Sequence, residues 1–443
     1  MTASKEPSSK KQSQPRTIRV EALTRVEGEG GLHVRLRGDQ IEDVQLTIFE
    51  PPRLFEAFLR GRSLEDVPDI TARICGICPV AYQMSSVHAL EAALGASISP
   101  EIRRLRRLLY CGEWIESHAL HVHLLHAPDF LGYESGLAMA QDYPDEVNRG
   151  LKLKKYGNEL LEVLGGRAIH PINTAVGGFY RAPRREELQA LIPAFEWGLQ
   201  AAIDTTRWTA TLEKPDFERP YCLVALVHPD EYAMNEGRIA SSEGDSVSAA
   251  EYEDHYEERH VPYSTALHAV RKPDDSSYFL GPLARVNLSL ERLSPSARRL
   301  ADEVGISWPC GNPFQSIVAR GLELVHAFEE GLEILKTYTP PKPSKIAYEY
   351  RAGVGSAATE APRGLLYHRY AVDENGLVKE AKIVPPTSQN QGQIEDDLRH
   401  WLPHVLDLEE TETVKSCESL VRCYDPCISC STHFLRLTVE RMP

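Results

Sequence analysis

Two Cys-x-x-Cys pairs lie near opposite ends of the 443-residue chain, and they constrain its fold more than any other feature. The first pair is Cys75-Gly-Ile-Cys78 and the second is Cys427-Ile-Ser-Cys430. Two thiols at this spacing ahead of a helix can chelate one metal ion, because the helix N-terminus and the metal both favour the thiolate form. Four thiolates together select zinc, iron–sulfur, nickel or copper(I). Such a site requires a fold that brings the two ends of the chain together.

The two pairs alone leave several kinds of site open. A structural zinc site would use all four thiolates, although zinc ribbons usually keep their pairs within about 15–20 residues of each other. A thiol–disulfide redox site would need only the first pair, and its strand–helix context is not thioredoxin-like. Nickel, copper(I) and an iron–sulfur group are also compatible with four thiolates. The remaining five cysteines lack paired metal spacing and are predicted to be packed thiols: Cys111, Cys222, Cys310, Cys417 and Cys423.

The pattern of apolar residues predicts a mainly helical α+β protein. Helical periodicity and helix-start signals favour helices over 54–59, 79–94, 99–126, 183–212, 312–338 and 391–402. Alternating apolar residues predict strands over 18–22, 32–36 and 44–48, and a hairpin of strands 365–372 and 377–384 around Asp373-Glu-Asn-Gly376. Residues 229–262 are polar and are expected to form a long excursion.

The chain shows no internal repeat and no clear linker, which favours one large domain over three. We expect a single domain over 17–433, with a central helical bundle and small β-sheets and hairpins built from both chain ends. Residues 1–16 are rich in Lys, Ser, Gln and Pro and are predicted to be a disordered tail without a secretory signal. The net charge of −15 argues against a nucleic-acid partner, and no run of 18 apolar residues predicts a transmembrane segment. These features predict a cytoplasmic protein.

The residues that flank the cysteines make the chain resemble the large, catalytic subunit of nickel–iron hydrogenases. The resemblance extends over nearly the whole chain, and the two cysteine motifs at opposite ends are its most specific part. The motifs that carry it are Leu23-Thr-Arg-Val-Glu-Gly28, Arg73-Ile-Cys-Gly-Ile-Cys-Pro79, Gly166-Arg-x-x-His-Pro171, Glu360-Ala-Pro-Arg-Gly364, Val384-Pro-Pro-Thr-Ser-Gln-Asn390 and Asp425-Pro-Cys-Ile-Ser-Cys430. The resemblance implies the fold of that family and the reversible heterolytic cleavage of H2 into two protons and two electrons.

The resemblance also implies a metal centre. By the family pattern, all four thiolates hold nickel, with Cys75 and Cys427 as terminal ligands. Cys78 and Cys430 would bridge the nickel to an iron that carries CO and cyanide. Soft thiolate ligands suit a redox-active nickel.

Residues around this centre are implied in the same way. Glu27 matches the carboxylate that takes the proton, together with the Cys427 thiolate. Arg363, after Pro362, matches a guanidinium that lies over the metals. Thr387 matches a hydroxyl that donates to a cyanide, and His121 matches a histidine of the surrounding shell.

A second metal site is implied near the C-terminus. Glu56, the backbone carbonyl of Ile383 and His433 match the residues that hold Mg or Fe in the family. Residues 434–443 follow His433, and in the family a specific endopeptidase removes such an extension after nickel insertion. We therefore expect cleavage after His433.

Two positions depart from the respiratory members of the family. Tyr82 and Ser117 stand where many of those members carry His and Asp. This pattern fits better with the cytoplasmic, multisubunit class that is linked to NAD(P) and includes the sulfhydrogenases.

The sequence implies partner subunits. No cysteine set remains for an iron–sulfur cluster, so a small subunit with such clusters must receive the electrons. No Gly-x-Gly-x-x-Gly fingerprint occurs, so NAD(P) and flavin would bind to diaphorase subunits. Two alternatives compete with the hydrogenase interpretation: a structural four-thiolate zinc protein, and a non-catalytic relative such as the quinone-site subunit of respiratory complex I, which lacks the four cysteines.

Overall fold

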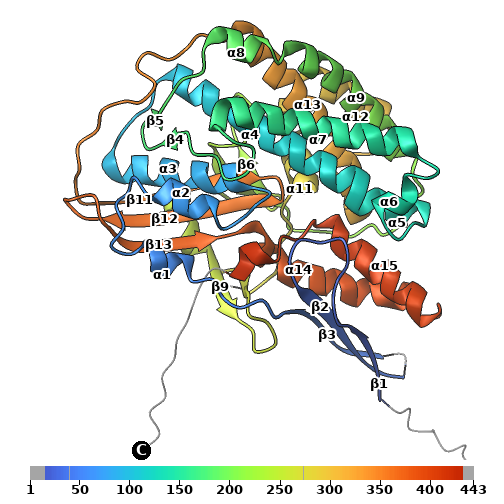
Figure 1. Ribbon diagram of the computed structural model, residues 1–443. Helices are drawn as coiled ribbons and strands as arrows, with labels where there is room; N and C mark the ends of the chain where they lie inside the picture. Colours follow the sequence, from blue (N-terminus) through green and yellow to red (C-terminus); the bar gives the residue numbers. More distant parts are fainter. Residues whose placement is uncertain (1–14, 39, 273, 433–443) are drawn as a thin grey trace, which may run out of the picture.

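A bundle of long helices occupies the upper part of the molecule, and antiparallel sheets lie beside and beneath it (Figure 1). The structure is a computed structural model that describes residues 15–38, 40–272 and 274–432. The bundle consists of α4 (Pro100–Leu120), α7 (Pro144–Gly165), α9 (Ile192–Thr211) and α13 (Ser316–Thr337). Helix α4 packs against α7 and α13, and α13 packs against α9. The predicted mainly helical α+β fold with a central bundle is therefore confirmed.

Helix α4 begins where its capping signal predicts. The Ser99 hydroxyl accepts a hydrogen bond from the Ile102 N–H at 3.3 Å, and Pro100 occupies the first turn, where no N–H donor is needed. The predicted helix to residue 126 is not α-helical throughout, because a π-helical turn (His121–His126) follows α4 before α5 (Ala127–Leu131). Such turns are frequent at functional sites.

Two other predicted helices are broken near their starts. The stretch 183–212 divides into α8 (Arg185–Gln189) and α9, because Pro193 lacks the N–H that a continuous helix would need and instead sits in the first turn of α9. The stretch 312–338 begins with a 3-10 turn (Pro313–Gln315) before α13. Helices α7 and α15 (Glu410–Cys423) were not among the predicted elements.

The N-terminal sheet is an antiparallel meander of β1 (Pro15–Val20), β2 (Gly30–Arg37) and β3 (Gln40–Ile48), as the alternating pattern predicts. Strand β1 begins two residues inside the segment predicted as a tail. Its buried face packs in one apolar cluster with residues of α14 (Pro386–Trp401) and α15. The first and last parts of the chain therefore share a core, as expected for sheets built from both ends.

A second three-stranded sheet carries the predicted hairpin. It consists of β11 (Gly353–Ala361), β12 (Gly364–Val372) and β13 (Val378–Val384), and α3 (Pro79–Leu94) packs on β11 and β12. The Asp373 side chain accepts hydrogen bonds from the N–H groups of Asn375 and Leu377, which closes the turn between β12 and β13. Strand β11 was not predicted.

The predicted polar excursion 229–262 contains regular structure. It includes β7 (Arg238–Ser241), β8 (Ser246–Val247), α10 (Tyr252–His255) and β9 (Tyr256–His260). Strand β6 (Val224–Val227) joins β7 and β8 in one sheet, and β9 pairs with β10 (Leu267–Arg271). The other elements are α1 (Phe55–Leu59), α2 (Val67–Ala72), α6 (Gly136–Met139), α11 (Pro282–Ser289), α12 (Pro295–Glu303), β4 (Thr174–Ala175), β5 (Gly178–Phe179) and 3-10 turns over Ala249–Glu251, Leu290–Arg292, Leu402–His404 and Ser429–Thr432.

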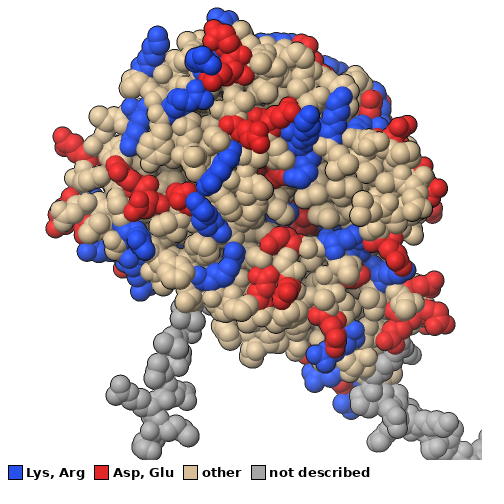
Figure 2. All heavy atoms as spheres, viewed as in Figure 1, with Lys and Arg blue, Asp and Glu red and all other residues tan. Residues whose placement is uncertain are grey.

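The surface carries mixed charge. On the face shown in Figure 2, basic and acidic side chains are interspersed and do not gather into one large patch of a single sign. Among the residues that the structure describes, no helix is long and apolar enough to cross a membrane.

Candidate metal centre

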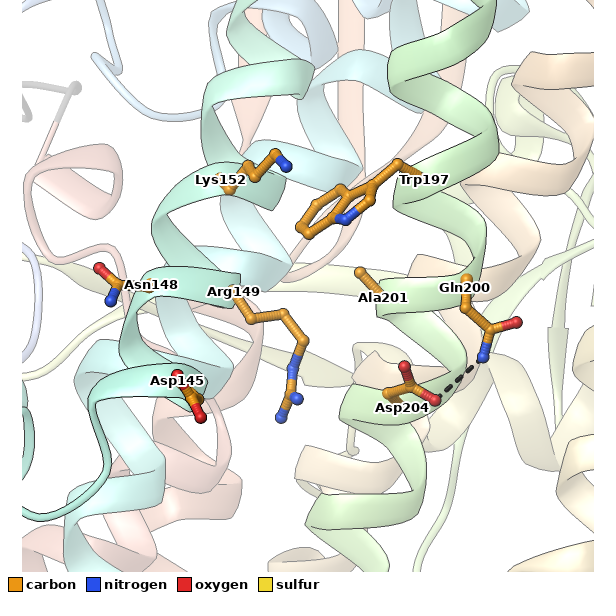
Figure 3. Close-up of a pocket in the computed structure, with 8 residues that line it drawn as sticks. All are labelled: Asp145, Asn148, Arg149, Lys152, Trp197, Gln200, Ala201 and Asp204. Carbon is orange, nitrogen blue, oxygen red and sulfur yellow. Dashed lines mark hydrogen bonds between the residues drawn. The ribbon is translucent and has the colours of Figure 1, made fainter.

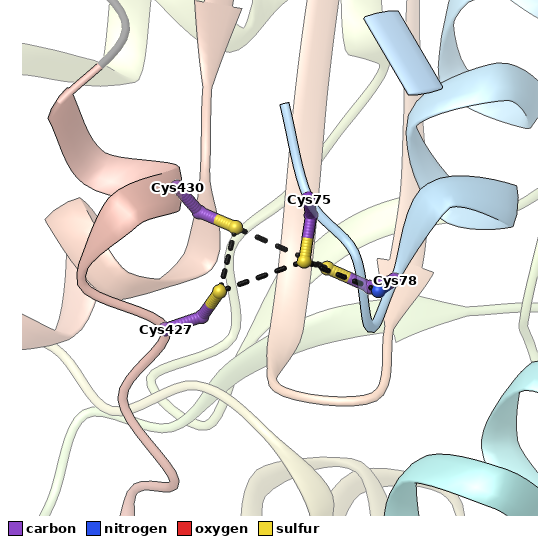
Figure 4. A group of neighbouring side chains, drawn as sticks. All are labelled: Cys75, Cys78, Cys427 and Cys430. Carbon is purple, nitrogen blue, oxygen red and sulfur yellow. Dashed lines mark hydrogen bonds between the residues drawn. The ribbon is translucent and has the colours of Figure 1, made fainter. Parts of the chain in front are cut away.

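The two cysteine pairs meet in the interior. The Sγ atoms of Cys75, Cys78, Cys427 and Cys430 all lie within 4.8 Å of one another (Figure 4). The separations are 2.9 Å within the first pair and 2.7 Å within the second, and 3.6 and 4.0 Å between the pairs. All exceed the ~2.05 Å of a disulfide bond, and all four thiols are free.

The burial and chemistry of this cluster fit a soft metal. Each of the four cysteines is at most 4% exposed, and all belong to the main apolar core. Four sulfur donors so close together would repel one another as thiolates unless a cation lay between them. Elsewhere in the described part of the chain, no other cluster of three or more His, Cys, Asp or Glu side chains has this geometry. The remaining five cysteines lie outside the cluster, as predicted.

Each cysteine pair lies in a turn next to a helix. Cys75 lies in the turn between α2 and α3, and Cys78 is the N-cap residue of α3. The Cys75 sulfur accepts hydrogen bonds from the N–H groups of Ile77 at 3.3 Å and Cys78 at 3.1 Å, an arrangement that stabilises a thiolate. Cys427 and Cys430 follow α15 at a 3-10 turn. Although burial raises the pKa of Cys75, hydrogen bonds from the three other thiols outweigh it and hold that pKa well below its ordinary value.

Glu27 reaches the second pair. Its Oε2 atom lies 2.9 Å from the Cys427 sulfur and accepts a hydrogen bond from the Ser429 N–H at 3.1 Å. Its carbonyl oxygen accepts from the Ile428 N–H at 2.9 Å, so Glu27 and Cys427 form a short parallel bridge. The neighbouring Gly28 has a φ of +89°, and a Cβ atom there would lie 2.8 Å from the Ile428 Cβ. This close backbone approach explains the glycine-rich turn of the motif.

Arg363 is fixed beside the cluster. Its Nε donates to the Asp425 carbonyl at 2.8 Å, one terminal nitrogen donates to the Asp425 carboxylate at 3.1 Å, and the other to the Ser117 hydroxyl at 3.4 Å. Arg363 is only 3% exposed. Burial opposes its charge, but Asp425 and the cysteine thiolates raise its pKa well above the ordinary value, so it stays a cation.

Of the other residues predicted to surround the centre, Thr387 contacts a cysteine directly, whereas His121 contacts only neighbours of the cluster. The Thr387 hydroxyl accepts a hydrogen bond from the Cys427 N–H at 3.0 Å, which leaves its own hydrogen available to donate. Pro362 lies in the turn before Arg363. His121 Nε2 lies 2.8 Å from the Arg422 carbonyl oxygen and 4.0 Å from Asp425, so His121 contacts the neighbours of the cluster. Burial lowers the pKa of His121 well below its usual value and keeps it neutral.

Two of the three residues predicted for the second metal site are neighbours. The Glu56 carboxylate accepts a hydrogen bond from the Ile383 N–H at 2.8 Å, whereas the prediction uses the Ile383 carbonyl. His433 lies outside the described residues. The carbonyl oxygen of Thr432, the last described residue, accepts a hydrogen bond from the Arg53 N–H at 2.5 Å. Arg53 is close to Glu56 in sequence.

The sequence motifs did not assign a role to several buried polar groups near the cluster. Asp425 belongs to a recognised motif, but only the structure shows that it holds Arg363. The Tyr82 hydroxyl is buried and has no hydrogen-bond partner among the described residues, so it is available to a bound group. The available signal in sequence was its place four residues after Cys78, where many respiratory members of the family carry His.

One surface pocket lies away from this site. A pocket of about 280 Å³ lies between α7 and α9 and is lined by residues such as Arg149, Lys152 and Trp197 (Figure 3). The Lys152 ammonium stacks 3.9 Å from the Trp197 ring centroid. None of the cysteines, nor any residue that contacts them, lines this pocket.

Comparison with known proteins agrees with the cysteine cluster. The family profile of nickel-dependent hydrogenases matches residues 53–149. The chain is 35% identical to the sulfhydrogenase 1 subunit alpha of Pyrococcus furiosus, over 95% of this chain and 98% of that relative. It is 27% identical to the NAD-reducing hydrogenase HoxS subunit beta of Cupriavidus necator, over 95% of each chain.

Comparison of the fold with solved structures identifies the same group of proteins. A crystal structure of an NAD+-reducing NiFe hydrogenase in its H2-reduced state superposes with a TM-score of 0.84 and 25% sequence identity, covering 94% of this chain and 99% of that one. These similarities do not favour the structural zinc protein or the non-catalytic complex I relative. The chain therefore belongs to the nickel-dependent hydrogenase family, as a large subunit with the catalytic role of that family.

Proposed function

We propose that Cys75, Cys78, Cys427 and Cys430 hold a nickel–iron centre at which H2 is reversibly cleaved. Cys75 and Cys427 would be the terminal nickel ligands, and Cys78 and Cys430 would bridge to an iron that carries CO and cyanide. The observation that carries this proposal is the buried four-sulfur cluster, with a guanidinium fixed on one side and a carboxylate 2.9 Å from one sulfur. When bound, the centre supplies the polarisation that splits H2 into protons and electrons.

Glu27 then moves the proton. The Cys427 sulfur is placed to hold a proton, and the Glu27 Oε2 atom at 2.9 Å is within hydrogen-bond reach to receive it. Ser429 links this carboxylate outward, since its N–H donates to Glu27 and its hydroxyl donates to Glu50 at 2.9 Å. Glu50 is half-buried, and because the amide N–H of Ser429 cannot pass on a proton, we infer that a water molecule carries the proton from Glu27 to Glu50 and on to solvent.

Arg363 and Thr387 hold the ligands of the centre. The Arg363 cation, oriented by Asp425, stabilises negative charge on cyanide and in the transition state. The Thr387 hydroxyl has a hydrogen to donate because its oxygen already accepts from the Cys427 N–H. Both groups are nearly fully buried, so water does not compete with them.

A second metal and a maturation step complete the proposed site. Mg or Fe would be held by Glu56, Ile383 and His433, and the contact between Glu56 and Ile383 supports this set. An endopeptidase would remove residues 434–443 after nickel insertion. Intact-mass analysis of active enzyme tests this step, because a catalytically active chain that ends at Pro443 would contradict it.

Electrons would leave through partner subunits. We infer a small subunit with iron–sulfur clusters and a flavin-containing diaphorase that reduces NAD(P), because the names of the relatives include an NAD-reducing enzyme. The cytoplasmic location stays a prediction. Purification of the complex with its flavin, followed by assay of H2 oxidation with NAD or NADP, tests the acceptor; activity with artificial dyes alone would argue against it.

Infrared spectroscopy of the purified complex tests the centre itself. We expect about one nickel per chain and separate CO and cyanide stretching bands. Zinc in place of nickel would support the structural alternative. Active, nickel-loaded enzyme without CO and cyanide bands would contradict the proposed centre.

A further inference from the structure

Arg285, on α11, has an unusually complete set of partners. It is 1% exposed, and its guanidinium has five N–H donors, all of which are used. Two donate to the Glu323 carboxylate at 2.7 Å each, and one donates to the Glu360 carboxylate at 2.9 Å. The last two donate to the carbonyl oxygens of Ala361 and Pro362, each at 2.9 Å. The side chain therefore joins α13, where Glu323 lies, to the end of β11.

The two carbonyls belong to the turn that presents Arg363. Strand β11 ends at Ala361 and β12 begins at Gly364, so only Pro362 and Arg363 lie between them. The turn also packs directly on the segment ahead of α11, since a Cβ atom on Gly364 would lie 2.7 Å from the Leu280 Cβ. Arg285 therefore holds the backbone immediately before Arg363, whereas Asp425 holds the Arg363 side chain.

Further contacts hold the residues that surround Arg285. The Trp114 ring lies 4.5 Å from the guanidinium carbon, and its indole N–H donates to the Glu360 carbonyl at 3.1 Å. Glu323 also accepts from the Tyr232 hydroxyl at 2.7 Å and lies 2.9 Å from His118 Nε2. A buried guanidinium whose five N–H donors are all satisfied strongly favours one arrangement of the groups around it.

We propose that Arg285 is a positioning residue for the hydrogenase reaction, which fixes the turn 361–364 so that the Arg363 guanidinium keeps its place beside the four-cysteine centre. This inference rests on the proposed function of Arg363 and extends it to a residue that touches neither the cysteines nor a substrate. Lysine cannot replace Arg285 in this role, because it keeps the charge but offers three donors without the planar fork.

The matched comparison is Arg285→Lys against Arg106→Lys. Arg106 is also fully buried and makes a bidentate pair, with Glu91 at 2.6 and 2.8 Å, but it has no contact with the turn 361–364. Both variants lose a buried guanidinium and are expected to lower Tm by a similar amount. Only Arg285→Lys should shift the CO and cyanide bands and lower kcat for H2 oxidation by about ten-fold or more, since small displacements of positioned groups are costly.

Different outcomes test the role of Arg285 and the presence of the proposed metal centre. Arg285→Lys enzyme with wild-type nickel content, bands and kcat would overturn the inference, and so would equal band shifts in both variants. If Arg285→Lys does not fold, Glu360→Gln takes its place, since it alters one of the five contacts; unchanged bands in that variant would overturn the inference. Wild-type enzyme without CO and cyanide bands would instead overturn the proposed function, and this inference with it.

Discussion

The carboxylate of Glu27 lies 2.9 Å from the sulfur of Cys427, although the two residues are 400 positions apart in the chain. The backbone holds this contact from both sides, because the Ile428 N–H donates to the Glu27 carbonyl and the Ser429 N–H donates to the Glu27 carboxylate. A proton on the sulfur therefore needs no side-chain rearrangement to reach an acceptor.

Replacement of Glu27 by glutamine should lower H2 oxidation by about 100-fold or more, because the amide keeps the shape of the side chain but cannot accept and release the proton. Nickel content and the infrared bands should stay close to wild type, since Glu27 is not one of the four sulfur ligands. Assay of H2 oxidation together with nickel analysis checks both points.

Glu29 provides the control for this variant. It is an exposed carboxylate two positions along the same turn, and only its backbone N–H contacts Glu50. Glu29→Gln should retain wild-type activity. Equal losses in the two variants would mean that the charge of the turn matters and that Glu27 is not a specific proton acceptor.

Removal of one cluster cysteine should abolish nickel binding. Cys430→Ala leaves three sulfurs, and we expect nickel to fall below about a tenth of the wild-type content, because each thiolate is a soft, anionic ligand that binds nickel tightly. Cys111→Ala is the matched control, since Cys111 is equally buried but lies outside the cluster. Retention of nickel by Cys430→Ala, or its loss from Cys111→Ala, would contradict the assigned ligand set.

The convergence of the cysteines could be predicted from sequence. Each Cys-x-x-Cys pair is recognisable from its local spacing, and a four-thiolate site requires the two pairs to meet. The strands and the hairpin around Asp373 were likewise predictable, since turn chemistry and alternation are local. Helix α7 was missed because its sequence is rich in charged residues and its apolar face emerges only against α4. Strand β11 was missed because small residues dominate it, and only Val354 and Thr359 carry the β-branched side chains typical of strands.

The partners of the site were less predictable than the ligands. Asp425 and Arg285 act through long-range contacts with backbone carbonyls and carboxylates, and no spacing rule in sequence reports such contacts. The contact between Glu56 and Ile383 was predicted from the family resemblance alone, and the structure shows the N–H of Ile383 where the prediction used its carbonyl.

Replacement of Thr387 by valine should affect both stability and the cyanide bands. Valine keeps the shape of threonine but leaves the buried Cys427 N–H without an acceptor, which costs about 1–3 kcal/mol of unfolding free energy. Loss of the hydroxyl donor should also shift a cyanide stretching band. Thr387→Ser restores the oxygen and should recover both properties; a serine variant that behaves like the valine variant would show that packing, and not the hydroxyl, matters here.

Glu395 should make the stability of the fold depend on pH. Its carboxylate accepts hydrogen bonds from the Leu46 N–H at 2.7 Å and the Tyr263 hydroxyl at 3.0 Å, and burial raises its pKa from 4.5 to about 7 in spite of them. Between pH 4.5 and about pH 7, Glu395 keeps its proton in the folded chain but has lost it in the unfolded chain. The free energy of unfolding therefore falls as pH rises from about 4.5 to 7, by up to about 3 kcal/mol.

Glu395→Gln isolates this effect, because glutamine is nearly isosteric with the protonated acid. The variant should match wild type near pH 5 and exceed its stability by about 1–3 kcal/mol near pH 8, as measured by denaturant unfolding at both pH values. Glu159→Gln, which removes a partly exposed carboxylate that pairs with Lys155 at 3.4 Å, should leave the difference between the two pH values unchanged. If wild type and Glu395→Gln lose stability equally between pH 5 and pH 8, Glu395 is ionised in the folded chain across that range, and its hydrogen bonds from Leu46 and Tyr263 outweigh burial.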